Sequence, residues 1–129
     1  MLLLSSLDAF SAEEARATAD LREGNPFLRP DGLLDRAAYA ELMAQCFAAG
    51  AGALARQTET PPAALGYLAA LRDVVIHGDA RLGDTLTVSV KLVTTLGPVS
   101  VLEGEVRSAA DTLLATGQLK VFIPEQEQG

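Results

Sequence analysis

Residues 35–56 do not alternate strictly between apolar and polar residues. When they are placed on a helix, apolar side chains lie on all of its sides. The stretch lacks Pro and is rich in Ala, Leu and Met, which are strong helix formers. It predicts one helix of about 22 residues, roughly 30 Å long, with Asp35 as its N-cap. A helix that is apolar all round is expected to be buried in the core. Glu41 and Gln45 interrupt it four residues apart, so the two polar side chains share a face.

The rest of the chain shows the shorter patterns of strands. Residues 64–76 form a long, mostly apolar run, which suits a central strand that bends near Gly66 or Ala70. The other expected strands alternate apolar and polar positions: residues 85–93, 99–107 and 112–123, with a weaker signal at 15–21. Short turns between consecutive strands require antiparallel pairing. We therefore predict an α+β fold in which a long central helix is wrapped by a curved antiparallel sheet.

Length and charge narrow the class of protein. The 129 residues fit one domain, expected over 1–124, and the polar residues 125–129 are expected to form a disordered tail. The net charge is −7 and the ten Lys and Arg residues are scattered singly, which argues against nucleic acid as a partner. The apolar start at Met1 is too short for a signal peptide, and charged residues break the helix as a membrane span. We expect a cytoplasmic protein without membrane contact.

Few residues could carry metal or covalent chemistry. The chain has one Cys, Cys46, and one His, His77, so we expect no disulfide and no metal site. Cys46 lies within the predicted helix, and we interpret it as a small buried hydrophobic residue in preference to a nucleophile. There is no Gly-rich phosphate loop and no cofactor is expected; Gly50 and Gly52 are interpreted as allowing close packing of the helix on the sheet.

Several short motifs resemble one family. Residues 41–45, Glu-Leu-Met-Ala-Gln, are similar to the Glu-Ala-Met-Ala-Gln helix motif of the hotdog-fold beta-hydroxyacyl-acyl carrier protein dehydratases. Residues 24–28, 83–86 and 104–106 also match residues of that group, and the pattern resembles a subgroup of predicted 3-hydroxyacyl-carrier-protein dehydratases, some found with aryl polyene lipid pathways. The resemblance covers nearly the whole chain. It implies a hotdog fold, a homodimer or dimer of dimers with sheets joined edge to edge, an acyl thioester ligand and a role in fatty acid biosynthesis or related lipid metabolism.

The resemblance also implies roles for individual residues. Glu41 would be the catalytic carboxylate and Gln45 would shape the substrate pocket at the dimer interface. A backbone amide of Gly32 or Leu33 would polarise the thioester carbonyl, because amides at a helix start stabilise developing negative charge. Asn25 is a further candidate for substrate binding, although its turn sequence also fits a structural role.

The family's catalytic histidine is the main departure. Typical members carry His-Phe-Pro-Gly ahead of the helix, whereas the link from Arg29 to Tyr39 is too short and contains no His. The similar subgroup has a Pro-His ahead of a Pro-Met-Leu-Leu-Leu stretch. We hypothesise that Met1 corresponds to that internal Met and that the natural protein starts upstream and carries the His. The resemblance places the His77 loop at the far end of the sheet from the helix start, which favours a surface residue over an acid-base group.

Three function classes remain open. The first is a dehydratase that uses Glu41 and a histidine from outside this chain. The second is an acyl-thioester hydrolase in which Glu41 alone activates water or attacks the thioester. The third is a non-catalytic module that binds acyl thioesters or a carrier protein. The acidic charge argues against docking to an acidic carrier protein, unless basic residues gather at the tunnel mouth; the candidates are Arg22, Arg29 and Arg36.

Overall fold

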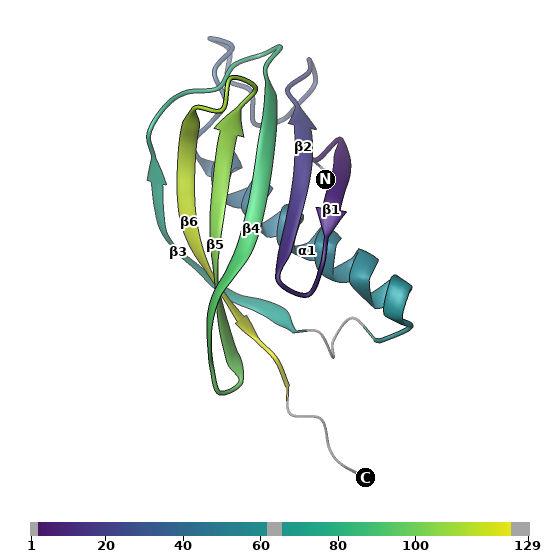
Figure 1. Ribbon diagram of the computed structural model, residues 1–129. Coiled ribbons are helices and arrows are strands. Elements are labelled where there is room, and N and C mark those ends of the chain that lie inside the picture. Colours follow the sequence, from purple (N-terminus) through teal and green to yellow (C-terminus); the bar gives the residue numbers. More distant parts are fainter. Residues whose placement is uncertain (1–2, 62–65, 125–129) are drawn as a thin grey trace.

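A long helix, α1 (Ala37–Thr58), lies across one face of a curved antiparallel sheet of six strands (Figure 1). The computed structural model describes residues 3–61 and 66–124, so the predictions for Met1, for residues 64–65 and for the tail at 125–129 lie outside it. The strands are β1 (Ser6–Phe10), β2 (Glu14–Asp20), β3 (Tyr67–Ile76), β4 (Thr85–Leu96), β5 (Val99–Ser108) and β6 (Leu113–Phe122). The predicted architecture, a central helix wrapped by an antiparallel sheet, is confirmed.

The strand order is β1-β2-β4-β5-β6-β3. Tight turns join β4 to β5 and β5 to β6, as the pattern predicts, and a further tight turn joins β1 to β2. The strand β3 instead pairs with β6, so the prediction of a central strand is wrong for the single chain: β3 lies at an edge. Its apolar composition suggested burial on both faces, but Tyr67 and Val75 are 53% and 49% exposed. Composition alone does not distinguish an edge strand from a central one.

One local detail of the strands agrees with the pattern and another differs from it. The bend expected in β3 is present, since the register with β6 shifts between Leu68 and Ala70 and again between Arg72 and Val75. The short strand β1 was not predicted, because its five residues carry too little alternation to stand out. It becomes a strand by pairing with β2 across a turn in which the Ser11 hydroxyl accepts hydrogen bonds from two following amides.

The helix begins two residues later than predicted and is not buried all round. The N-cap is Arg36, without a side-chain cap hydrogen bond, so the prediction of Asp35 as N-cap is wrong by one residue. The Asp35 carboxylate accepts a hydrogen bond from the Ala37 amide at 2.9 Å just ahead of the helix. One side of α1 packs on the sheet through Ala38, Tyr39, Leu42, Met43, Cys46 and Gly50, while Glu41 and Ala48 on the other side are exposed. The prediction failed because alanine counts as apolar yet buries little area, so an Ala-rich face can remain at the surface. Over the described residues, no helix has the length and apolarity needed to cross a membrane.

Glycines set the distance between helix and sheet. A Cβ at Gly104 or at Gly117, which pair across β5 and β6, would lie 2.8 Å from Met43 Sδ, so the missing side chains make room for this methionine. At Gly50 an added Cβ would lie 2.6 Å from the Ala15 Cβ on β2. The expectation of close packing is thus confirmed for Gly50. Gly52 points away from the sheet, and the nearest atom to its Cβ position is Arg56 Nη1 at 3.5 Å.

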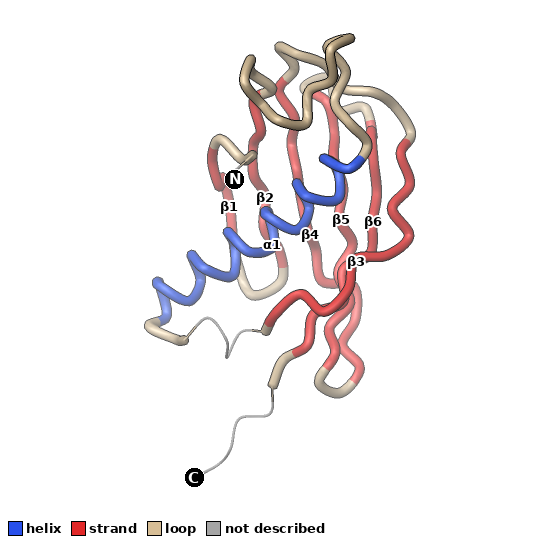
Figure 2. Tube along the Cα trace, turned by 180° about the vertical axis from the view of Figure 1, so that it is seen from behind, coloured by secondary structure: helices blue, strands red, loops and turns tan. Residues whose placement is uncertain are grey.

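A buried tyrosine anchors the loop at 77–84 to the start of α1. The Tyr39 hydroxyl donates to the Gly78 carbonyl at 3.2 Å and accepts from the Ala80 amide at 2.9 Å. Burial raises the pKa of this hydroxyl, so it stays protonated at neutral pH. Figure 2 shows the loops gathered around the start of the helix.

This contact corrects the predicted place of His77. The residue lies at the same end of the sheet as the helix start, not at the far end. The reason is that β3 follows the helix through a short link and runs back along it, so the end of β3 returns to the level where α1 begins.

Replacing Gly50 with Ala is expected to destabilise the protein by roughly 1–3 kcal/mol, because the new methyl group would push the helix off β2. Gly52→Ala is the matched control and should stabilise by about 0.5–1 kcal/mol through its higher helix propensity. Urea denaturation followed by circular dichroism measures both. Equal stabilisation by the two changes would contradict the close contact at Gly50.

Tyr39→Phe is expected to cost about 1–3 kcal/mol, since the Ala80 amide would lose its partner inside the protein. Amide hydrogen exchange should quicken at Ala80 more than in β4 or β5. The control is Tyr67→Phe, which removes a hydroxyl from a half-exposed ring and should leave stability almost unchanged. An unchanged exchange rate at Ala80 in Tyr39→Phe would count against the anchor.

Candidate functional site

A short chain of hydrogen bonds holds the predicted catalytic carboxylate. Gln45 Nε2 donates to Glu41 Oε1 at 3.1 Å, and the Leu3 amide donates to Gln45 Oε1 at 2.7 Å. The helix brings Glu41 and Gln45 together one turn apart, and the segment at the start of the described chain fixes Gln45 from the other side. Glu41 itself is exposed, so its carboxylate is open to a ligand while one of its oxygens is held in place.

Glu41 and Gln45 lie in the wall of an open groove between α1 and the beginning of β3. Its volume is about 470 Å³, and the rest of its lining is largely apolar: Ala44, Phe47, Ala48, Ala51, Gly52, Gly66, Tyr67 and Leu68. The helix residues beyond Gln45 are mostly small, which keeps the groove open along the helix. About 15 Å of helix axis separates Glu41 from Ala51. A carboxylate followed by an apolar wall suits a ligand with a polar reacting end and an apolar chain.

The sequence indicated only part of this groove. The alanines at positions 44 and 48 share the face of Glu41 and could be found from helical spacing. The contribution of Tyr67 and Leu68 could not, because it depends on where the edge strand β3 lies relative to the helix.

The amides of Gly32 and Leu33, which are proposed to polarise the substrate carbonyl, both form hydrogen bonds within the turn ahead of the helix. The Gly32 amide donates to the Arg29 carbonyl at 2.9 Å, and the Leu33 amide donates to Asp31 Oδ1 at 3.0 Å. A hydrogen bond from Arg29 also holds the pKa of the Asp31 carboxyl below its usual value, which keeps it an acceptor. The role of Gly32 or Leu33 in substrate binding stays a prediction, and it requires one of these amides to exchange its present partner for the substrate.

Asn25 builds a turn in the structure. Its side-chain Oδ1 accepts from the Phe27 backbone amide at 2.9 Å, and the Asn25 backbone amide donates to the Arg22 carbonyl at 3.2 Å. It lines a polar hollow formed with residues 3–6 and 22–26, not the groove at Glu41. Its role in substrate binding stays a prediction.

Cys46 and His77 stand apart from the groove. Cys46 is fully buried, with its Sγ 3.6 Å from the carbonyl oxygens of Ala15 and Val88. Burial raises the pKa of the thiol to about 12, so it carries no thiolate at neutral pH and its interpretation as a small core hydrophobe is confirmed. His77 is exposed in the loop after β3 and does not line the groove. Over residues 3–61 and 66–124, the His, Cys, Asp and Glu side chains form no cluster able to hold a metal ion.

The arginines expected at a tunnel mouth are largely paired. Arg29 forms an ion pair with Asp31, and Arg22 lies 3.5 Å from Asp20. Each arginine therefore has a carboxylate two residues away, and the local charge is close to balanced. The structure gives no unpaired basic rim from these two residues that would offset the overall acidity.

Comparison with known proteins places these features in a family. The whole chain, residues 1–129, matches the family model of ApeP-like proteins, described as ApeP dehydratase. Among solved structures, the dehydratase heterocomplex ApeI:P from Xenorhabdus doucetiae shares 25% identity with a TM-score of 0.79, over 97% of this chain and 84% of that one. A search of curated proteins finds no significant match.

Two further solved structures share the fold. AziG from S. sahachiroi has 18% identity and a TM-score of 0.76, over 94% of this chain and 91% of that one. A hypothetical thioesterase from Streptococcus pneumoniae TIGR4, solved with coenzyme A, has 13% identity and a TM-score of 0.75, over 95% and 88%. The expected hotdog fold is thereby confirmed, with dehydratases and thioesterases among its neighbours. The match over its full length means that the chain belongs to the ApeP-like dehydratase family, hotdog proteins of the acyl-thioester-processing class.

Proposed function

We propose that this protein works as a 3-hydroxyacyl-carrier-protein dehydratase, with Glu41 as its catalytic carboxylate. The observation that carries the proposal is the position of Glu41: exposed, held by Gln45 and lining an apolar groove, in a chain of a dehydratase family. The expected setting is cytoplasmic fatty acid biosynthesis or related lipid metabolism.

The reaction needs two proton transfers. A base removes a proton from the carbon next to the thioester carbonyl, and an acid protonates the hydroxyl on the following carbon, which leaves as water. A double bond then joins the two carbons. One carboxylate such as Glu41 and one imidazole would divide these transfers, and Gln45 would keep the carboxylate in a fixed orientation.

No histidine is among the described residues that line the groove, so the imidazole would come from elsewhere. A histidine upstream of residue 3 would enter beside Glu41, because the Leu3 amide is bonded to the same Gln45 side chain that holds the carboxylate. A partner subunit is the other source. The groove lies between the helix and the edge strand β3, so a chain added at that edge would face the groove.

We propose that this partner is a second copy, giving a homodimer or dimer of dimers, or a related hotdog chain. The half-exposed Tyr67 on β3 supports an interface at this edge. The second possibility is supported by the dehydratase heterocomplex that shares 25% identity with this chain.

Thioester hydrolysis is the second candidate function. The described groove lining contains Glu41 and no histidine, and a carboxylate alone can activate water or attack the thioester carbon. A protein that binds acyl thioesters without turnover would use the same groove and is distinguished by experiment.

Glu41→Gln is expected to lower the dehydration rate by about 10²–10⁴-fold, because it removes the proton acceptor and keeps the shape and the hydrogen-bonding capacity toward Gln45. Mass spectrometry of 3-hydroxyacyl and saturated acyl thioesters measures water loss and hydrolysis separately. The matched control is Glu103→Gln, an exposed glutamate on β5 that should leave the rate unchanged.

The same assay is run on this chain alone, on a version extended upstream, and on the assembly with a related hotdog chain. Water loss in any of the three forms, abolished by Glu41→Gln, would support the dehydratase, and the form that shows it would identify the source of the imidazole: a second copy, the upstream segment or a related hotdog chain. Hydrolysis by the chain alone would support the thioesterase. Binding without turnover in all three forms would contradict both activities.

A further inference from the structure

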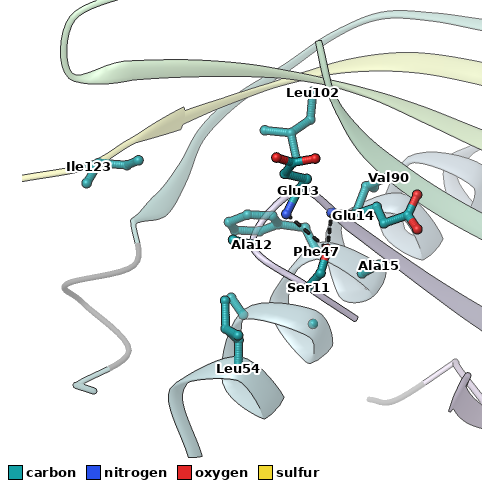
Figure 3. Close-up of a pocket in the computed structure, with 12 residues that line it drawn as sticks. Ser11, Ala12, Glu13, Glu14, Ala15, Phe47, Leu54, Val90, Leu102 and Ile123 are labelled. Atoms are coloured by element: carbon teal, nitrogen blue, oxygen red, sulfur yellow. Dashed lines mark hydrogen bonds between the residues drawn. The ribbon is translucent and has the colours of Figure 1, made fainter. Parts of the chain in front are cut away.

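A second hollow, separate from the Glu41 groove, lies between the last half of α1 and the sheet (Figure 3). Its volume is about 240 Å³. Figure 3 shows Leu102 and Ile123 on one side and Leu54 of the helix on the other. The lining is mainly apolar and comes from five parts of the chain: Ala15, Phe47, Leu54, Val90, Leu102 and Ile123, with the β1–β2 turn at residues 11–14. We call this hollow the distal pocket.

The packing around the distal pocket explains why it stays open. At Gly50 the helix touches Ala15 of β2 directly, which fixes one wall. The turn at its rim is closed internally, since the amides of Glu13 and Glu14 donate to the Ser11 hydroxyl at 3.1 and 3.2 Å. These two amides and the Ser11 hydroxyl are thus bonded to one another. The side chains of Glu13 and Glu14 line the pocket at the turn, and the remaining lining is mostly hydrocarbon. Apolar cavities of about 150 Å³ stay dry and bind small apolar molecules, so this pocket is large enough for several carbon atoms.

Two side chains connect the distal pocket to the proposed site. Phe47 and Ala51 line both the groove and the pocket, so the two hollows adjoin each other across these residues. Phe47 lies six residues after Glu41, about 9 Å along the helix axis. A linear ligand with its reacting end at Glu41 would therefore run along the small residues of the groove and meet Phe47 before the pocket.

We propose that the distal pocket receives the far end of a linear acyl chain and that Phe47 is the partition that sets which chain lengths are accepted. The identity of the ligand as an acyl thioester rests on the proposed function. Small side chains at 44, 48 and 51 leave the path open up to the partition, and the apolar walls beyond it favour a hydrocarbon end over a polar one. Each further methylene buried in the pocket raises affinity by about three- to fourfold.

The test measures binding rather than turnover. Isothermal titration calorimetry compares saturated butyryl-, octanoyl- and dodecanoyl-coenzyme A, with sodium dodecanoate as a free fatty acid, on the full chain in the assembly that it forms. The unchanged protein should bind dodecanoyl-coenzyme A more tightly than butyryl-coenzyme A. Leu54→Trp, which fills the pocket, should weaken dodecanoyl binding by about tenfold, the loss of roughly two methylenes, while butyryl binding changes by less than about twofold.

The matched control is Leu96→Trp, the same exchange at a side chain that is 67% exposed on the β4–β5 hairpin, and it should change neither affinity. A second variant keeps the test decisive if Leu54→Trp fails to fold. Phe47→Ala joins the groove to the pocket and should raise the ratio of dodecanoyl to butyryl affinity.

Equal effects of Leu54→Trp on both chain lengths, or an unchanged or lower ratio in Phe47→Ala, would overturn the proposal. Tighter binding of free dodecanoate than of dodecanoyl-coenzyme A would assign the pocket to a free fatty acid and overturn the thioester assignment. A protein that dehydrates its substrate but shows no effect of the pocket variants would refute this inference alone. Effects of the pocket variants without dehydration would support it and refute the proposed reaction.

Discussion

The close contact between α1 and the sheet is the constraint on which the rest of the structure depends. It is made where side chains are missing: Gly50 rests on Ala15, and Gly104 and Gly117 receive Met43. Because Gly50 meets Ala15 without space for a side chain between them, and Met43 fills the space over two glycines, the helix has little freedom to shift or rotate. The direction of Glu41, the width of the groove and the shape of the distal pocket all follow from this fixed position.

Most of the polar side chains discussed around the start of the helix already have hydrogen-bond partners within the protein. Tyr39 bonds to the loop at 77–84, Asp35 accepts from the Ala37 amide, and Asp31 and Asn25 close the turns before the helix. Asn25, Asp31 and Asp35 each accept a hydrogen bond from a backbone amide. Glu41 differs from them, since its exposed carboxylate is bonded to the Gln45 side chain, which a ligand's polar group could replace. Rigid surroundings with one open carboxylate are the arrangement that catalysis by a positioned acid or base requires. The second proton-transferring group is the part that the described residues do not supply within the groove.

In the proposed binding mode, two parts of one helix contact the polar end and the apolar chain of the ligand. The first half of α1 carries the polar pair Glu41 and Gln45, and the second half carries Phe47 and Leu54 against the strands. The edge strand β3 closes the groove on one side, which links the site to whatever covers that edge. The proposed substrate site and the proposed assembly interface therefore share the edge strand β3.

The sequence by itself determined the parts that depend on local pattern. Helical composition and alternating strands predicted α1, β2, β4, β5 and β6, and the spacing of Glu41 and Gln45 predicted their shared face, because these features follow from the periods of helix and strand. Only the tertiary structure decided the features that depend on long-range packing. It placed β3 at the edge, exposed the Ala-rich face of α1 and brought the His77 loop to the helix start. Residues far apart in the chain make these contacts, and no local period encodes which of them will meet.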